Sequence, residues 1–260
     1  MKNDQPQDRG PWGRNQSSQP SGGQPKQPPI FNAPAVVVWT IGFLVLAFLF
    51  FTVMPASFVG QLERAAGVMP VRFLAGPEAN GGILGMLAPL VSHMALHAGL
   101  MHIFFNCVWL LAMGTPVALR LGAGAPNNGL LPSSLFLSFF VLSGVAGALF
   151  YVGLNTKSFA LLVGASGGIS GLLGALLRIL LRPRPHFARP NNDLVPLTDR
   201  NLLIWTVLIL IFNVVFAFYG SPVGAQQSNI AWEAHMGGFL FGLLTFPIFD
   251  NFARRYSRNG

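Results

Sequence analysis

A serine and a histidine that could act as nucleophile and base open two apolar segments far apart in the chain. Ser166 stands in the sequence Gly164-Ala165-Ser166-Gly167, and His235 stands near the start of the last apolar segment. A serine hydroxyl attacks a carbonyl carbon only when a base removes its proton, and histidine, with a pKa of about 6.5, suits that role. These two residues therefore indicate acyl-transfer chemistry.

Two further polar residues could stabilise the negative charge that forms on the attacked carbonyl oxygen. His102 and Asn106 are spaced i, i+4, which puts both side chains on one face of a helix. Ser166 lies at a predicted helix start, where backbone N–H groups lack helical partners and can donate to the same oxygen. These groups are the candidate donors of an oxyanion hole.

A catalytic triad is not expected, because no carboxylate is placed to orient the imidazole of His235. Glu233 is two residues away, and residues spaced i, i+2 on a helix do not face each other. Asp250 lies at the opposite end of the same segment. We therefore predict a Ser–His dyad whose imidazole is oriented by packing or by another polar contact.

The composition places these residues in a membrane protein. Hydrophobic residues make up 52% of the 260 residues and charged residues 9%, whereas soluble domains carry about 25% charged residues. A soluble enzyme, a disordered protein and a disulfide-stabilised scaffold are excluded, the last because Cys107 is the only cysteine. The expected fold class is therefore an all-α polytopic membrane protein.

Six apolar segments are long enough to cross a bilayer as helices, which takes about 20 residues. They are residues 35–54, 99–119, 133–152, 165–181, 202–219 and 230–249. A shorter apolar piece, residues 83–91, contains Pro89 and is expected to lie in the interface. The predicted domains are a disordered cytoplasmic tail at 1–32, a six-helix membrane domain at 33–252 and a basic cytoplasmic tail at 253–260.

The positions of the basic residues predict the orientation of these segments. With both termini inside, only Arg64, Arg72 and Lys157 of the 16 Lys and Arg residues fall on the outer side. The second, fourth and sixth segments then run from outside to inside, so the candidate residues lie in one layer just below the outer surface. The long connection at 55–98 is expected to be a surface loop or a lid that packs on the membrane.

Pairs of glycines spaced i, i+4 predict close contact between the fourth and sixth segments, which the pairing of Ser166 with His235 requires. The pairs are Gly164/Gly168, Gly167/Gly171 and Gly238/Gly242. A transporter or channel with a polar site inside the membrane is the alternative from another class. It is disfavoured because the polar layer does not continue inward, where beyond Asn106 and Ser170 there are only scattered hydroxyls and Asn213.

Together these residues resemble a known family, the rhomboid intramembrane serine proteases. The resemblance rests on His93-x-x-x-His97-x-x-x-x-His102-x-x-x-Asn106, then Gly164-Ala165-Ser166-Gly167, then Ala234-His235-x-x-Gly238-x-x-x-Gly242. It implies a rhomboid-like bundle in which Ser166 is the nucleophile, His235 is the general base, and His102 and Asn106 line the oxyanion hole. It also implies structural roles for Gly164, Gly167, Gly238, Gly242 and His97.

The resemblance further implies what the protein acts on and where. Substrates would be single-span membrane proteins, cut in their transmembrane segments near the outer face of a bacterial inner membrane. The connection 55–98 would be a lateral element dipping into the lipid bilayer, and the fifth segment would be the substrate gate. A catalytically silent rhomboid-like protein that binds membrane helices is the alternative within the family.

No cofactor, metal or nucleic-acid partner is expected. The spacing of His93, His97 and His102 could suggest a metal site, but no carboxylate or thiol pattern supports one. The membrane topology explains the basic inner loops, so nucleic acid is not needed to account for them.

The sequence departs from the family pattern at three places. Ala118, two residues before Arg120, stands where the family often has Glu, so a structural contact is expected to be missing there. Ser170 stands where the family often has an aromatic residue that stacks on the catalytic histidine, and the first connection lacks a Trp-Arg pair. None of these changes removes a catalytic group, so an active enzyme is expected.

Overall fold

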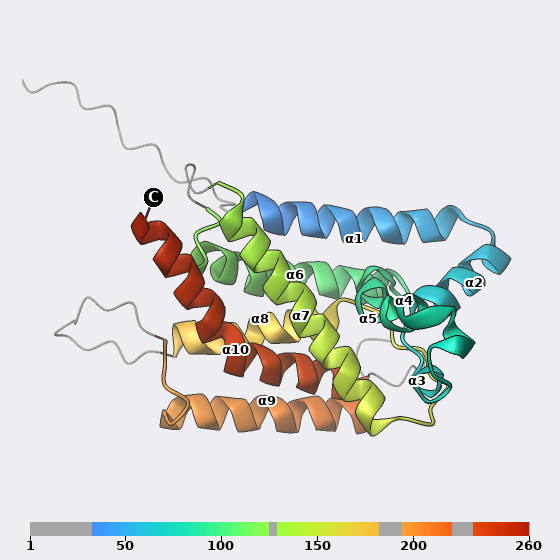
Figure 1. The fold of residues 1–260 in the computed structure, drawn as a ribbon. Coiled ribbons are helices and arrows are strands. Elements are labelled where there is room, and N and C mark those ends of the chain that lie inside the picture. Colours follow the sequence, from blue (N-terminus) through green and yellow to red (C-terminus); the bar gives the residue numbers. More distant parts are fainter. Residues whose placement is uncertain (1–32, 125–128, 182–193, 220–230, 260) are drawn as a thin grey trace, which may run out of the picture. The chain divides into compact units, whose positions relative to one another are not determined.

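The described part of the chain is built from helices. The computed structural model describes residues 33–124, 129–181, 194–219 and 231–259 (Figure 1). Within these ranges the chain forms ten α-helices, two short 3₁₀ turns and one isolated antiparallel bridge between Val68 and Leu162. The predicted all-α class is therefore confirmed, and the predicted tail at 1–32 lies outside these ranges.

Four helices in the described residues are long and apolar enough to cross a membrane. They are α1 (Ala35–Val53), α6 (Leu100–Arg120), α7 (Leu131–Leu154) and α10 (Trp232–Asn259), the last of which continues into the segment expected to be a basic tail. Side chains such as Trp39 and Phe43 are 76% and 61% exposed on α1, which water would disfavour and lipid would not. The chain is therefore an integral membrane protein.

Two more apolar helices, α8 (Ser166–Leu180) and α9 (Arg200–Tyr219), fall on the predicted fourth and fifth segments. α8 has 15 residues and α9 has 20, and neither is among the four helices named above as long and apolar enough to cross a membrane.

The first connection is not a structureless loop. It contains the helices α2 (Ala56–Ala66), α3 (Val71–Leu74), α4 (Gly82–Leu87) and α5 (Pro89–Ser92), with 3₁₀ turns at Glu78–Asn80 and His93–Ala95. Met54 adopts an extended backbone before Pro55, as residues before proline do, and this ends α1 just before α2 begins. Because so few residues separate α1 from α2, α2 must lie close to the membrane surface.

The helices α7, α8 and α10 pack against one another more closely than the other helices do. Glycines make this possible between α8 and α10, which lie side by side in Figure 1. A Cβ atom on Gly238 would collide with the backbone of Gly167, and one on Gly242 would collide with the backbone of Gly171. The two helix backbones are therefore in direct contact, as small-residue faces permit in a membrane.

The helix α9 packs less extensively, against α10 and α8. The segment before it is held to the bundle by Arg178, whose Nε donates to Val195 O at 2.6 Å and whose Nη1 donates to Leu243 O at 2.9 Å. Asp199 Oδ1 accepts from Leu202 N at 3.0 Å and caps the first turn of α9. The N-terminal end of α9 is therefore anchored, while much of its length has apolar side chains exposed, such as Leu208 at 50%.

An ion pair joins the far ends of α6 and α10. Arg120 Nε lies 2.6 Å from Asp250 Oδ1, Arg120 Nη2 lies 3.1 Å from Oδ2, and Arg254 Nη2 also lies 2.9 Å from Oδ2. Asp250 is only 2% exposed. Ala118, where a glutamate contact was expected to be missing, is fully buried in the core, and Arg120 finds its carboxylate on α10.

Candidate active site

The structure brings Ser166 and His235 together. Ser166 is the first residue of α8 and His235 lies in the first turn of α10, with His235 Nε2 2.8 Å from Ser166 Oγ. Both side chains are partly buried. The contact follows from the glycine packing above, because α8 and α10 could not approach this closely with larger residues on the shared face.

The other ring nitrogen of His235 faces an amide that the sequence analysis did not assign to the site. His235 Nδ1 lies 3.3 Å from Asn213 Oδ1, and Asn213 Nδ2 donates to the backbone oxygen of Trp232 at 2.8 Å. The second contact orients the amide so that its oxygen points to the imidazole. His235 Nδ1 must then carry the proton, which leaves Nε2 free to accept one from the hydroxyl of Ser166.

A signal for Asn213 was present in the sequence. An amide inside an otherwise apolar helix is costly in lipid, so such a residue is retained for a function or a contact. Nothing local indicated which contact, because Asn213 lies on another helix, 22 residues before His235. The expected polar contact to the imidazole is thus supplied by α9 and not by a carboxylate.

His102 lies over the turn that precedes Ser166. The backbone N–H of Ala98 donates to His102 Nδ1 at 3.3 Å, so the proton of a neutral imidazole resides on Nε2. A Cβ atom on Gly164 would lie 2.6 Å from His102 Nε2, and Gly164 has a φ of +114°, a conformation open to glycine. The donor nitrogen of His102 therefore sits against the backbone two residues before the serine.

Asn106 is buried, at 4% exposure, one turn after His102 on α6. Its Nδ2 donates to the backbone oxygen of His102 at 2.8 Å, and its Oδ1 is buried without a partner among the described residues. No hydrogen bond joins Asn106 to Ser166 or His235 in the described part of the chain. The second proton on its Nδ2 is the group that could reach a developing oxyanion.

Two histidines from the first connection support this arrangement. The ring of His97 packs edge-on against that of His102 with centroids 5.1 Å apart, and burial, with a smaller contribution from His102, lowers the pKa of His97 to about 4. The carbonyl of buried His93 accepts from Gly164 N at 2.9 Å. His93 and His97 therefore position Gly164 and His102, and the described residues contain no cluster of ligands suited to a metal ion.

These features define an integral membrane protein in which apolar helices bring a serine and a histidine into hydrogen-bonding contact. A sequence model of the rhomboid domain matches residues 84–251. This match covers more than half of the chain, which therefore belongs to the rhomboid family. The family includes serine intramembrane proteases and inactive homologues.

Individual relatives agree with this assignment. The chain is 30% identical over 164 residues to the rhomboid protease GluP of Bacillus subtilis, a match that covers 63% of this chain and 25% of that protein. It is 34% identical over 154 residues to the rhomboid protease GlpG of Serratia proteamaculans, covering 59% of this chain and 45% of the relative. Rhomboid-related protein 2 of mouse is 26% identical over 166 residues, with coverages of 62% and 48%. The match spans less than half the length of each of these relatives.

Proposed function

We propose that this protein is an intramembrane serine endopeptidase. One observation carries the proposal: Ser166 Oγ lies 2.8 Å from His235 Nε2, and the opposite nitrogen of the same ring is held by Asn213. A nucleophile, a base within hydrogen-bond reach and a group that orients the base are the three parts that nucleophilic catalysis requires. An inactive homologue would have no need to keep all three aligned.

The chemistry follows from the positions of these groups. As Ser166 Oγ attacks the scissile carbonyl carbon, His235 Nε2 takes the hydroxyl proton and later delivers it to the leaving amine. The backbone N–H of Ser166, His102 Nε2–H and Asn106 Nδ2–H donate to the oxyanion. A water molecule, deprotonated by His235, then hydrolyses the acyl-enzyme and restores the serine.

The substrates are transmembrane segments of single-span membrane proteins, cut near the outer face of a bacterial inner membrane. This rests on six crossings with both termini inside, which place the first turns of α6, α8 and α10 at the outer side. The ion pair of Arg120 with Asp250 then lies toward the inner side, where basic residues are enriched. A helical substrate must unwind locally to expose a peptide bond, so helix-destabilising residues at the cut favour cleavage.

Reconstituted protein tests the proposal directly. Proteoliposomes holding the full chain and a tagged single-span reporter are expected to yield two fragments, with the cut in the outer part of the reporter's span by mass spectrometry. A fluorophosphonate probe is expected to label Ser166 and to stop cleavage. Absence of both labelling and cleavage would favour a binding protein, and solute flux without labelling would favour a transporter. Labelling without cleavage would show an activated serine whose substrate is not among the reporters.

The contact with Asn213 predicts a smaller but specific effect on rate. Asn213→Ala is expected to lower kcat by about tenfold to a hundredfold with KM little changed, because the imidazole loses its preferred tautomer and orientation. Asn213→Asp keeps an oxygen that can accept from Nδ1 but loses the Nδ2 donor to Trp232 O, so it is expected to recover only part of the rate. Steady-state cleavage of the same reporter measures both.

Thr206→Val on the same helix provides the matched control, since it also removes a polar group from α9. If Thr206→Val lowers kcat as much as Asn213→Ala, the effect comes from loosening α9 and not from the imidazole contact. A loss in Asn213→Ala that appears in KM and not in kcat would also contradict the positioning role.

A further inference from the structure

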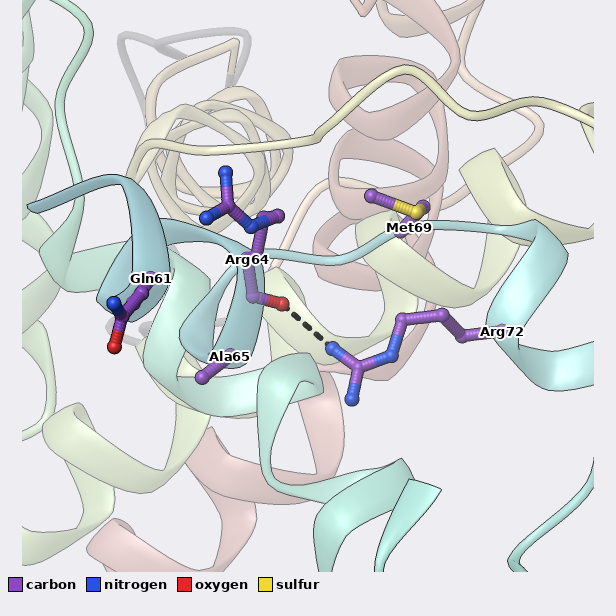
Figure 2. Close-up of a pocket in the computed structure, with 5 residues that line it drawn as sticks. All are labelled: Gln61, Arg64, Ala65, Met69 and Arg72. Carbon is purple, nitrogen blue, oxygen red and sulfur yellow. Dashed lines mark hydrogen bonds between the residues drawn. The ribbon is translucent and has the colours of Figure 1, made fainter. Parts of the chain in front are cut away.

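An open, shallow cavity of about 380 Å³ lies on the surface of the first connection, and neither Ser166 nor His235 lines it. Figure 2 shows its lining residues, Gln61, Arg64 and Ala65 from α2, with Met69 and Arg72 from the turn and helix that follow. Two of the three basic residues assigned to the outer side by topology therefore meet at one cavity. The topological preference for basic residues on the inner side does not explain their presence here.

The guanidinium of Arg72 is held in a fixed orientation by neutral groups. Its Nε donates to Asn80 Oδ1 at 2.7 Å, and its Nη1 donates to the backbone oxygen of Arg64 at 2.6 Å, drawn as a dashed line in Figure 2. Asn80, at 9% exposure, is itself fixed by donating to the backbone oxygens of Arg72 and Gly76. The guanidinium is thus preorganised while its positive charge is not neutralised.

Among the described residues no carboxylate forms an ion pair with Arg64 or Arg72, although Glu63 and Glu78 lie in the same connection. The ion pairs within the described residues join Asp250 to Arg120 and to Arg254, and neither involves Arg64 or Arg72. Arg64 is exposed. Figure 2 shows the Arg64 guanidinium on the opposite side of its backbone from Arg72, where it folds back toward Gly60, so the two groups do not converge on one point. Their positive charges still add at the cavity and favour an anion there.

Exposed apolar side chains are also found on the helices of the first connection. Phe58 on α2 is 46% exposed, Leu74 on α3 is 61% exposed, and Ile83 and Leu84 on α4 are 65% and 79% exposed. With α2 beginning directly after α1, these side chains can enter lipid while the arginines stay at the level of the headgroups. This arrangement favours a lipid over a soluble anion.

We propose that this cavity binds the phosphate group of an anionic phospholipid in the leaflet at the C-terminal end of α1. Arg72 donates from its fixed guanidinium, Arg64 supplies the second positive charge, and the lipid's acyl chains lie against Phe58 and Leu74. A planar guanidinium matches the oxygens of a phosphate, which an ammonium does less well. The proposal does not depend on the catalytic activity of Ser166.

The test measures binding of phosphatidylglycerol to the purified full chain in phosphatidylcholine nanodiscs, using native mass spectrometry of the ejected protein. Arg72→Gln and Arg64→Gln are each expected to raise the apparent Kd at least about tenfold. Arg72→Lys is expected to give an intermediate loss, because it keeps the charge and loses the planar donor. Lys157→Gln removes one charge on the same side of the membrane from a residue that does not line the cavity, and is the matched control.

Equal losses for Lys157→Gln and both arginine variants would show diffuse attraction to anionic lipid and would overturn the proposal. Arg64→Gln is expected to fold normally, because Arg72 Nη1 donates to the backbone oxygen of residue 64, which the variant keeps. A loss of binding in this variant therefore cannot be ascribed to misfolding. Inorganic phosphate at millimolar concentration should not displace bound phosphatidylglycerol. If it does so as effectively as added lipid, the cavity binds a free anion and the lipid assignment is wrong.

Discussion

Ser166→Ala is expected to lower the rate of reporter cleavage by about 10³-fold or more in proteoliposomes, with the protein still folded. Removing the hydroxyl leaves His235 Nε2 without the group it activates at 2.8 Å, and no covalent acyl-enzyme can form. His235→Ala is expected to cause a similar loss. The double variant is expected to be no worse than either single one, because the two residues act as a unit.

Ser170→Ala is the control for this experiment. Ser170 lies one turn after Ser166 on the same helix and is likewise partly buried, yet His235 contacts only Ser166 of the two in the described structure. It is expected to retain near-normal cleavage and fluorophosphonate labelling. If activity survives in Ser166→Ala and disappears in Ser170→Ala, the nucleophile is Ser170, and the assignment of Ser166 is wrong.

The geometry also suggests how access and chemistry are linked. Asn213, which orients the base, is carried by α9, the helix with the less extensive packing against α8 and α10. If α9 is the element that admits substrates, as the family resemblance implies, its return to the bundle re-forms the contact with His235. A substrate helix would then have entered the site before Asn213 aligns the imidazole of His235.

Much of this structure could be predicted because its signals are local. Composition and the length of apolar segments indicated an all-α membrane protein, and glycine spacing indicated which helices approach closely. The helices α3 to α5 were not predicted, since each is too brief to show a hydrophobic period. The eleven-residue helix α2 is amphipathic, a pattern that the sequence analysis did not use. Contacts between distant residues were also missed: Asn213 with His235, and Asp250 with Arg120, 130 residues away.

Asp250 illustrates why such contacts escape sequence analysis. From the sequence it served only to show that no carboxylate could reach His235, because it lies at the far end of the same helix. Its actual partner depends on how α6 and α10 cross, which neither helix encodes alone. The same crossing explains why Ala118 is tolerated: the space is filled by core packing, and Arg120 turns to α10 for its counter-ion.

Asp250→Leu is expected to destabilise the protein by about 3–5 kcal/mol, because it leaves Arg120 facing Arg254 with no carboxylate between them. Arg120 is 9% exposed, so water can solvate little of the uncompensated charge. Reversible unfolding in mixed micelles, followed by circular dichroism, measures the change. Cleavage by the remaining folded protein is expected to be nearly normal, since the pair lies at the opposite end of α10 from His235.

The double variant Arg120→Met with Asp250→Leu separates a buried charge from a lost contact. Replacing both partners by apolar residues removes the buried cation together with its carboxylate, so most of the stability is expected to return. Arg255→Gln, which removes an exposed charge beside Arg254, should shift the unfolding free energy by less than about 0.5 kcal/mol. A double variant as unstable as Asp250→Leu would mean that the ion pair itself, and not the cost of an orphaned arginine, holds α6 to α10.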